Sequence, residues 1–268
     1  MDNVSDAMLM KLNRASLVEQ INSLGFTTVD ENTPLSELAE CMKWAGGLRD
    51  LRLAAFHRSS KVYRFFTRAE WEDLSSFTRA PYMRIGLVIR AYGQQFLIAR
   101  SDAHTAAGSY TMQWHPTNAD DVRGLTNFSG MPSMYDDMDG QGNTDKILAF
   151  GEEMSMSFPA AENARAYKAT TVADGGADDP TTWSLPAIGQ LWIMYKCYNE
   201  INAEMAYYFG TSAGLSNDWY WSSSEQSSSL AWYVYMSIGY VASNNKSTAG
   251  RVRPVARVPV SALSGSAI

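Results

Sequence analysis

Residues 220–255 carry the side-chain types best suited to molecular recognition. Their sequence, YWSSSEQSSSLAWYVYMSIGYVASNNKSTAGRVRPV, mixes large apolar residues with Tyr, Ser, Asn, Ala and Gly. An exposed tyrosine offers a broad amphipathic ring at a low entropic cost, and serine and asparagine add adaptable hydrogen bonds. This mixture predicts a noncovalent binding face that is displayed on a rigid scaffold.

The spacing of these residues separates binding positions from scaffold positions, because successive side chains of a β-strand point to opposite faces. One face of the strands predicted on either side of Gly239 is large and apolar, and it comprises Trp232, Val234, Met236 and Val241. The other face is aromatic and polar, and it comprises Tyr233, Tyr235, Ser237, Tyr240, Ala242 and Asn244. Gly239 permits the turn between the two strands. A tyrosine-rich sheet that packs on its own domain is the alternative, since aromatic residues favour strands in any context.

The residues that could perform catalysis or bind a metal are scattered. His57, His104 and His115 are the histidines of the chain, and none has the neighbours of a Ser-His-Asp triad or of a metal site. Residues 136–143, DDMDGQGN, offer oxygen ligands for calcium but lack the later acidic residue that closes an EF-hand loop. We therefore expect no enzyme activity, no metal and no cofactor. We expect this loop to form turns and to cap the following helix.

The composition bounds the architecture and argues against several functions. The chain has 268 residues, of which 46% are hydrophobic and 19% charged, and its net charge is −6. This length permits one large domain or two small ones, and the lack of clustered Lys and Arg argues against nucleic-acid binding. No apolar run is long enough for membrane insertion, and residues 1–17 lack the pattern of a secretory signal peptide. Cys41 and Cys197 lie far apart and are expected to be free, buried thiols.

The first 82 residues are predicted to precede the binding domain. Leucines recur at helical spacing in residues 1–50, and Thr33 with Pro34 marks the start of a second helix. The run SLVEQINSLGFTTVDENTPLSELAECM resembles helical segments of phage tail and baseplate proteins that help to assemble trimers. Residues 1–50 are therefore a candidate segment for homo-oligomerisation, with a helical hairpin inside the monomer as the alternative. Residues 51–82, which are basic and aromatic, are expected to be a connector with some strand content.

Residues 83–260 follow the order strands, helices, strands. A hairpin is expected at Tyr92 and Gly93, which separate two apolar runs. Helices are expected from residue 143 or 144 to 150, over 160–168, and from an N-cap at Ser184 to a stop at Gly210. The residues after Gly210 alternate strands and turns. This order predicts an α+β domain whose first and last strands can pair.

Four separated motifs resemble the C-type lectin-like domains of a bacterial and phage family. They are WSLPAIGQLWIMYKCYNEIN at 183–202, YWSSSE at 220–225, AWYV at 231–234 and VRPV at 252–255. The resemblance covers residues 85–258 and implies a C-type lectin-like fold over 83–260, preceded by a small N-terminal helical segment. It also implies that Glu225 belongs to the framework and hydrogen-bonds neighbouring loops.

The C-terminal stretch most resembles the variable proteins of diversity-generating retroelements. In that family, mutation of adenines turns asparagine codons into codons that end in a pyrimidine, which encode Tyr, Ser, Ala or Asn but not Trp, Met or Gln. The resemblance implies a variable ligand-binding region at about 219–250. The binding residues that it implies are Trp219, Gln226, Ser229, Leu230, Tyr233, Tyr235, Ser237, Tyr240, Ala242, Ser243 and Asn244. Gln226 departs from the simplest form of the coding rule.

A protein of this family would bind a protein or glycan receptor through its diversified face, and copies in a trimer or other oligomer would add avidity. The resemblance favours a phage virion, with the protein at the tail tip, over an adhesin on a bacterial cell surface. Formylglycine-generating enzymes share the fold, but their chemistry needs closely placed cysteines, and Cys41 lies outside the lectin-like region. A calcium-dependent carbohydrate-binding lectin and a structural virion protein without a diversified site are the alternatives.

Overall fold

The computed structural model describes residues 14, 18, 30, 32–34, 49–117, 121–132, 137–169 and 179–259. The chain divides into two compact units, one of Met1–Asp50 with Ile89–Gln95 and one of Leu51–Val88 with Phe96–Ile268. The predicted helices and oligomerisation segment before residue 50 lie almost entirely outside the described residues. In the first unit, Tyr92 and Gly93 have φ angles of 54° and 73°. Two successive positive φ angles are typical of a tight hairpin turn, so the hairpin predicted there is confirmed.

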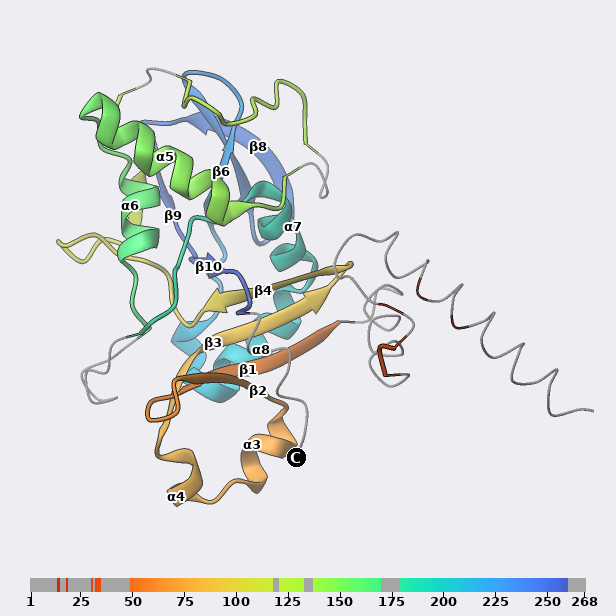
Figure 1. The fold of residues 1–268 in the computed structure, drawn as a ribbon. Coiled ribbons are helices and arrows are strands. Elements are labelled where there is room, and N and C mark those ends of the chain that lie inside the picture. Colours follow the sequence, from red (N-terminus) through yellow and green to blue (C-terminus); the bar gives the residue numbers. More distant parts are fainter. Residues whose placement is uncertain are drawn as a thin grey trace, which may run out of the picture. The chain divides into compact units, whose positions relative to one another are not determined.

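The first sheet has five strands in the order β10–β4–β3–β1–β2 (Figure 1). The strands are β1 (Asp50–His57), β2 (Val62–Phe66), β3 (Tyr82–Ala91), β4 (Gln94–Ala99) and β10 (Val255–Ala256). The antiparallel pairing of β10 with β4 places Val255 opposite Ile98. The last strand of the chain therefore joins the sheet of the first strands, as the sequence predicted.

Residues 51–82 contribute two strands to this sheet, so the strand content expected of this segment is confirmed. In β1 the run from Leu53 to Phe56 is buried, and Phe56 faces Tyr63 of β2 with their ring centroids 5.1 Å apart. Among the basic residues of this segment, Arg64 and Arg68 are exposed, whereas Arg52 and Arg58 are partly buried. Helices α3 (Arg68–Asp73) and α4 (Ser76–Arg79) follow the two strands. The sheet therefore begins at residue 50, and the expected boundary at 83 falls inside it.

The second sheet carries the predicted binding stretch. Its order is β5–β9–β6–β7–β8, so β8 is an edge strand. The strands are β5 (Thr111–Gln113), β6 (Trp219–Glu225), β7 (Leu230–Tyr235), β8 (Tyr240–Asn245) and β9 (Ala249–Arg251). The β6–β7 and β7–β8 pairs are antiparallel, whereas β6 and β9 run parallel. The chain is therefore an α+β protein with two β-sheets.

Most of the helices between the two groups of strands contact the second sheet (Figure 1). They are α5 (Gly140–Met154), α6 (Pro159–Ala166), α7 (Ile188–Lys196) and α8 (Tyr198–Phe209), and a short 3-10 helix follows at Thr211–Ala213. Helix α5 contacts β6, and α7 contacts both β6 and β7. Helix α8 instead meets the first sheet, where Arg84 of β3 donates to the Tyr208 carbonyl. The Asp139 carboxylate accepts a hydrogen bond from the Gly142 N–H at 2.9 Å and caps α5. The prediction that the 136–143 loop caps the next helix is confirmed for its described part, 137–143.

The single long helix expected from Ser184 to Gly210 was wrong in two respects. The main chain of Ser184 pairs with Val255 through hydrogen bonds of 2.8 and 2.9 Å, so Ser184 does not cap a helix. Helix α7 instead starts after Ala187, whose N–H donates to the Gln190 side chain. Cys197 has non-helical angles and separates α7 from α8. Gly210, with a φ of 94°, ends α8 as expected.

Cys197 is a buried cysteine that is not in a disulfide, as predicted, whereas Cys41 lies outside the described residues. In the described ranges, no helix combines the length and the apolar character that a membrane span requires.

Replacement of Trp232 by Ala tests the division between scaffold and face. Trp232 is 5% exposed, and its indole N–H donates to the Phe128 carbonyl at 3.0 Å. We expect Trp232→Ala to lower the free energy of unfolding by about 3–5 kcal/mol, as for other buried large-to-small changes. Chemical denaturation measures this loss. Tyr240→Ala, at a side chain that is 57% exposed, is the control and should cost less than about 1 kcal/mol; equal losses would contradict the assignment.

Candidate ligand-binding face

Burial alternates along β7 and β8 as the sequence predicted. The side chains of the apolar set are at most 5% exposed, and they are Trp232, Val234, Met236 and Val241. The side chains of the other set are half-buried or exposed, and they are Tyr233, Tyr235, Ser237, Tyr240, Ala242 and Asn244. The side chains of the first set therefore pack inside the protein.

The register of the three strands aligns the second set into rows, because cross-strand partners project from the same face of a sheet. In one row, Tyr235 of β7 lies opposite Trp219 of β6 and Tyr240 of β8. In the next row, Tyr233 lies opposite Trp221 and Ala242. Asn244 lies opposite Ala231 in a third row. We call this surface the tyrosine face, and it consists of Trp219, Tyr233, Tyr235, Tyr240, Ala242 and Asn244.

The tyrosine face passes gradually from the hydrophobic core into solvent. Trp221 is fully buried at its inner end, and Tyr240 is 57% exposed on the edge strand. Between them, the Trp219 ring lies 4.9 Å from the rings of Trp221 and Tyr233, measured between centroids. Trp219 and Tyr233 also pack against the core. The inner half of the face is therefore an anchored aromatic floor, and the outer half is open.

Two of the predicted binding residues do not lie on the tyrosine face. Ser243 is the cross-strand partner of Trp232, and Leu230 lies two positions before Trp232 on the same strand. Both therefore project to the face opposite the tyrosines, where they are half-buried. The period of two along a strand makes this assignment unavoidable once the register is known. Leu230 and Ser243 therefore lie on the Trp232 side of the sheet, and their role as binding residues stays a prediction.

The remaining predicted residues lie in the turns at either end of β7. The Gln226 N–H donates to the Leu230 carbonyl at 2.9 Å, and Ser229 accepts from the Lys246 N–H at 3.0 Å, so both belong to the β6–β7 turn. Ser237 is exposed in the β7–β8 turn. Ile238 in that turn is 68% exposed. Sequence reasoning missed Ile238, although an apolar residue beside a turn glycine is a usable signal.

Gly239 holds the β7–β8 turn against helix α7. Its φ is 66°, in the region that favours glycine. A Cβ atom at this position would lie 2.1 Å from Cε1 of Tyr195, so a larger residue would also displace that ring. Gly250 of β9 likewise makes room for Trp219, since its Cβ would lie 2.4 Å from Cζ3 of that indole.

A buried ion pair connects the ends of the strands that bear the tyrosine face. The Lys246 ammonium contacts the Glu225 carboxylate, and both side chains are fully buried. The carboxylate also accepts the Val122 N–H at 3.1 Å, and the ammonium lies 4.7 Å from the centroid of the Trp114 ring. Loss of water raises the pKa of Glu225, and the attraction of Lys246 opposes that rise. The prediction that Glu225 hydrogen-bonds neighbouring loops is confirmed.

A second buried cluster fixes β6 and β9. Arg253 donates to the Asp102 carboxylate at 2.7 Å and to the carbonyls of Ala99, Ala213 and Gly214. The Tyr220 hydroxyl donates to the same carboxylate at 3.0 Å. Burial, together with the nearby Asp102 charge, raises the pKa of Tyr220. Arg253 and Tyr220 are therefore structural residues, and their charges and hydroxyls are not available to a ligand.

The loop that resembled a calcium site uses its oxygens inside the protein. The Asp137 carboxylate accepts hydrogen bonds from Ser224 at 2.6 Å and Asn143 at 2.7 Å. Asp139 caps α5 and forms an ion pair with Arg257 at 2.7 Å. Asp136 lies outside the described residues. Among the residues that the structure describes, no three His, Cys, Asp or Glu side chains converge as metal ligands.

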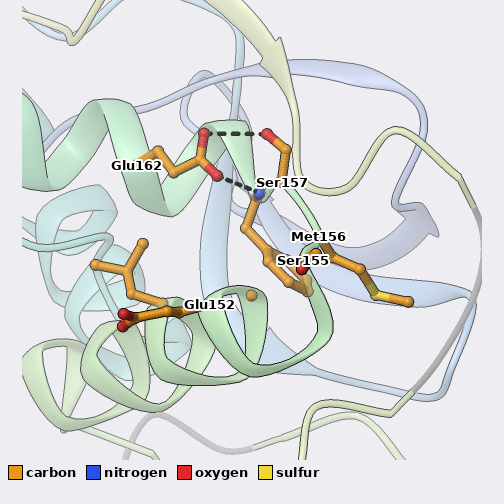
Figure 2. Close-up of a pocket in the computed structure, with 8 residues that line it drawn as sticks. Glu152, Ser155, Met156, Ser157 and Glu162 are labelled. Atoms are coloured by element: carbon orange, nitrogen blue, oxygen red, sulfur yellow. Dashed lines mark hydrogen bonds between the residues drawn. The ribbon is translucent and has the colours of Figure 1, made fainter.

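A hollow of about 420 Å³ lies between the end of α5 and the start of α6, away from the tyrosine face. Figure 2 shows Glu162 turned toward Ser157, whose hydroxyl donates to it at 3.0 Å, and the Phe158 N–H donates to the same carboxylate at 2.7 Å. Ser155 ends α5 with a φ of 52°. The hydrogen bonds of the Glu162 carboxylate thus stabilise the turn between α5 and α6, beside which the hollow lies.

A double-mutant cycle tests the ion pair. Lys246→Met leaves the Glu225 carboxylate buried without its cation, and we expect a loss of about 3–5 kcal/mol in the free energy of unfolding. Glu225→Gln combined with Lys246→Met removes both charges and should recover much of that loss, because no unpaired charge then stays buried. Chemical denaturation of the single and double variants measures the coupling. Strictly additive losses would show that the two side chains do not depend on each other.

The sequence matches no family model and no curated protein. Among solved structures, the chain is similar to a fimbrial protein from Bacteroides ovatus, with 13% identity and a TM-score of 0.38. The similarity covers 78% of this chain and 34% of that protein, so this chain spans about a third of its length.

Proposed function

We propose that this protein binds a receptor through the tyrosine face, displayed on a C-type lectin-like scaffold of the kind diversified by retroelements. The observation that carries the proposal is the separation of polar contacts between framework and face. Within the described residues, the hydroxyls of Tyr233, Tyr235 and Tyr240 form no hydrogen bond with the protein. The framework residues beside them, such as Trp232 and Glu225, have their polar groups satisfied inside the protein.

This separation allows the face to change without loss of the fold. Substitution of Tyr235 or Tyr240 removes no internal hydrogen bond, and at Tyr240, which is 57% exposed, it also removes little buried area, so its cost to stability is small there. Tyr233 packs on Trp219 and is the less tolerant position. The aromatic floor would anchor a partner, and Tyr240, Ser237 and Ile238 on the open side would determine which partner binds.

The partner is a protein or a glycan on a cell surface, and the protein acts on a phage tail tip or as a bacterial surface adhesin. The sequence resemblance of residues 220–255 and of the N-terminal run supports this setting. Oligomerisation, with a trimer favoured, would place several tyrosine faces on one particle and raise the avidity by orders of magnitude. Neither catalysis nor a cofactor enters this function.

The DNA that flanks the gene tests the diversification directly. We expect a near-copy of the segment that encodes residues 219–255, differing almost only at adenines, beside a reverse transcriptase gene. Sequencing of both flanks in the source genome is the measurement. If neither flank carries such a repeat, the diversification is refuted, although binding by the tyrosine face would still be open to test.

Two matched libraries test whether the face tolerates change. The first randomises the face positions Tyr233, Tyr235, Ser237, Tyr240, Ala242 and Asn244, and the second randomises the scaffold positions Trp232, Val234, Met236 and Val241. We expect most clones of the first library to melt within about 4 °C of the parent, the shift that about 1 kcal/mol produces in a domain of this size. Most clones of the second should not fold, because their substitutions open or overfill the core.

Selection on an unrelated protein completes the library test. The first library should yield specific binders to immobilised streptavidin, measured by surface plasmon resonance against the parent chain. Equal loss of folded clones from both libraries would show that the tyrosine face is part of the framework, and folded clones that never bind would show that the face is not a recognition surface.

A further inference from the structure

A second hollow, of about 400 Å³, lies among residues that the tyrosine face does not use. Its wall includes Phe56 and Tyr63 from the β1–β2 hairpin and Lys61 from the turn between these strands. Gln141 of α5 and the segments 180–182 and 257–259 complete it. All these residues belong to one compact unit. The volume falls in the range of sites that hold one small ligand.

Lys61 supplies an unpaired positive charge at this hollow. Its side chain is exposed, and in the described part of the chain it forms no ion pair. The ammonium lies 5.9 Å from the centroid of the Phe56 ring, which holds it beside the apolar wall. The φ angle of Lys61 is 59°, which is uncommon for a residue with a side chain. This conformation closes the β1–β2 turn, in which the Lys61 N–H donates to the His57 carbonyl at 2.8 Å.

Arg257 supplies a second cation with spare donors. One of its terminal nitrogens donates to Asp139 at 2.7 Å. A guanidinium carries five N–H groups in a planar fork, so other donors face away from that bond. Asp139 pairs with Arg257, so Lys61 is the cation of the lining that has no acidic partner, and the described lining contains no acidic side chain. A guest with one negative charge would match the charge of Lys61.

The uncharged polar groups of the wall are an amide and hydroxyls, which can hydrogen-bond the hydroxyls of a ligand. Among the described residues, the Gln141 amide and the Thr182 hydroxyl make no hydrogen bond. The Tyr63 hydroxyl lies 3.1 Å from that of Thr181, and each oxygen keeps further bonding capacity. Burial raises the pKa of Tyr63, so its hydroxyl keeps its proton at neutral pH.

We propose that this hollow binds one acidic monosaccharide unit, such as a hexuronic acid. The carboxylate would meet Lys61 and the free edge of Arg257, and the ring hydroxyls would reach Gln141, Thr182 and Tyr63. The C–H face of the sugar would lie on the apolar wall. A bare carboxylate would leave the amide and hydroxyl partners unused, and a neutral sugar would leave the Lys61 charge unmatched.

Binding of D-glucuronate to the full chain tests this assignment. We expect saturable binding by isothermal titration calorimetry at low ionic strength, and weaker binding as salt screens the charges. Lys61→Gln should weaken the affinity about tenfold or more, as expected for the loss of a charge-assisted hydrogen bond. Lys196→Gln is the matched control, because this exposed lysine lies 5.8 Å from the Tyr195 ring and outside the hollow. It should bind like the parent.

Several outcomes would overturn the proposal. These are the absence of saturable glucuronate binding, equal weakening by Lys61→Gln and Lys196→Gln, or glucose binding as tightly as glucuronate. Acetate binding as tightly as glucuronate would reduce the hollow to a carboxylate site, and tighter binding of N-acetyl-diglycine would assign it to a peptide terminus. Tyr240→Ala should leave glucuronate binding unchanged, so failure here is distinguishable from failure of the tyrosine face.

Discussion

The buried ion pair between Glu225 and Lys246 ties together the strands that carry the tyrosine face. Glu225 ends β6 and Lys246 follows β8, so their contact closes the span of chain that forms the face. Removal of each charge from water costs several kcal/mol. Mutual attraction, the Val122 N–H and the Trp114 ring offset this cost together. Such a pair is favourable in one geometry, and it therefore constrains the ends of the strands that bear the tyrosine face.

Other buried polar side chains are also hydrogen-bonded within the protein. Tyr220 and Arg253 both donate hydrogen bonds to the Asp102 carboxylate, and Ser224 donates one to the Asp137 carboxylate. These polar groups lie on the interior side of the protein or at its joints, and each is committed to a protein partner. The tyrosine hydroxyls of the face are left to solvent or to a ligand. The polar groups that hold the strands in place and the hydroxyls that are open to solvent thus belong to different side chains.

Local sequence patterns predicted much of the separation between buried and exposed side chains, and the predictions that failed did so for physical reasons. The alternation from Trp232 to Val241, the turn at Gly239 and the hairpin at Tyr92 follow from local rules of strand and turn geometry. The side of the sheet on which Ser243 and Leu230 lie follows only from the register between β7 and β8. Ser184 has the chemistry of a helix cap, but its main chain is taken by Val255, a residue far away in sequence. The main-chain pairing with a distant strand thus outweighs the local preference of serine for a helix N-terminus.

The sequence by itself determined which residues of β7 and β8 are buried and which are exposed, because that pattern depends only on the two-residue period of a strand. It also determined the α+β class and that Cys197 is not in a disulfide. Only the tertiary structure decided how exposed each residue of the tyrosine face is and that β1 and β2 belong to the first sheet. It also decided that Lys61, Arg257 and Gln141 line one hollow. These properties depend on contacts between distant segments, which no local period encodes.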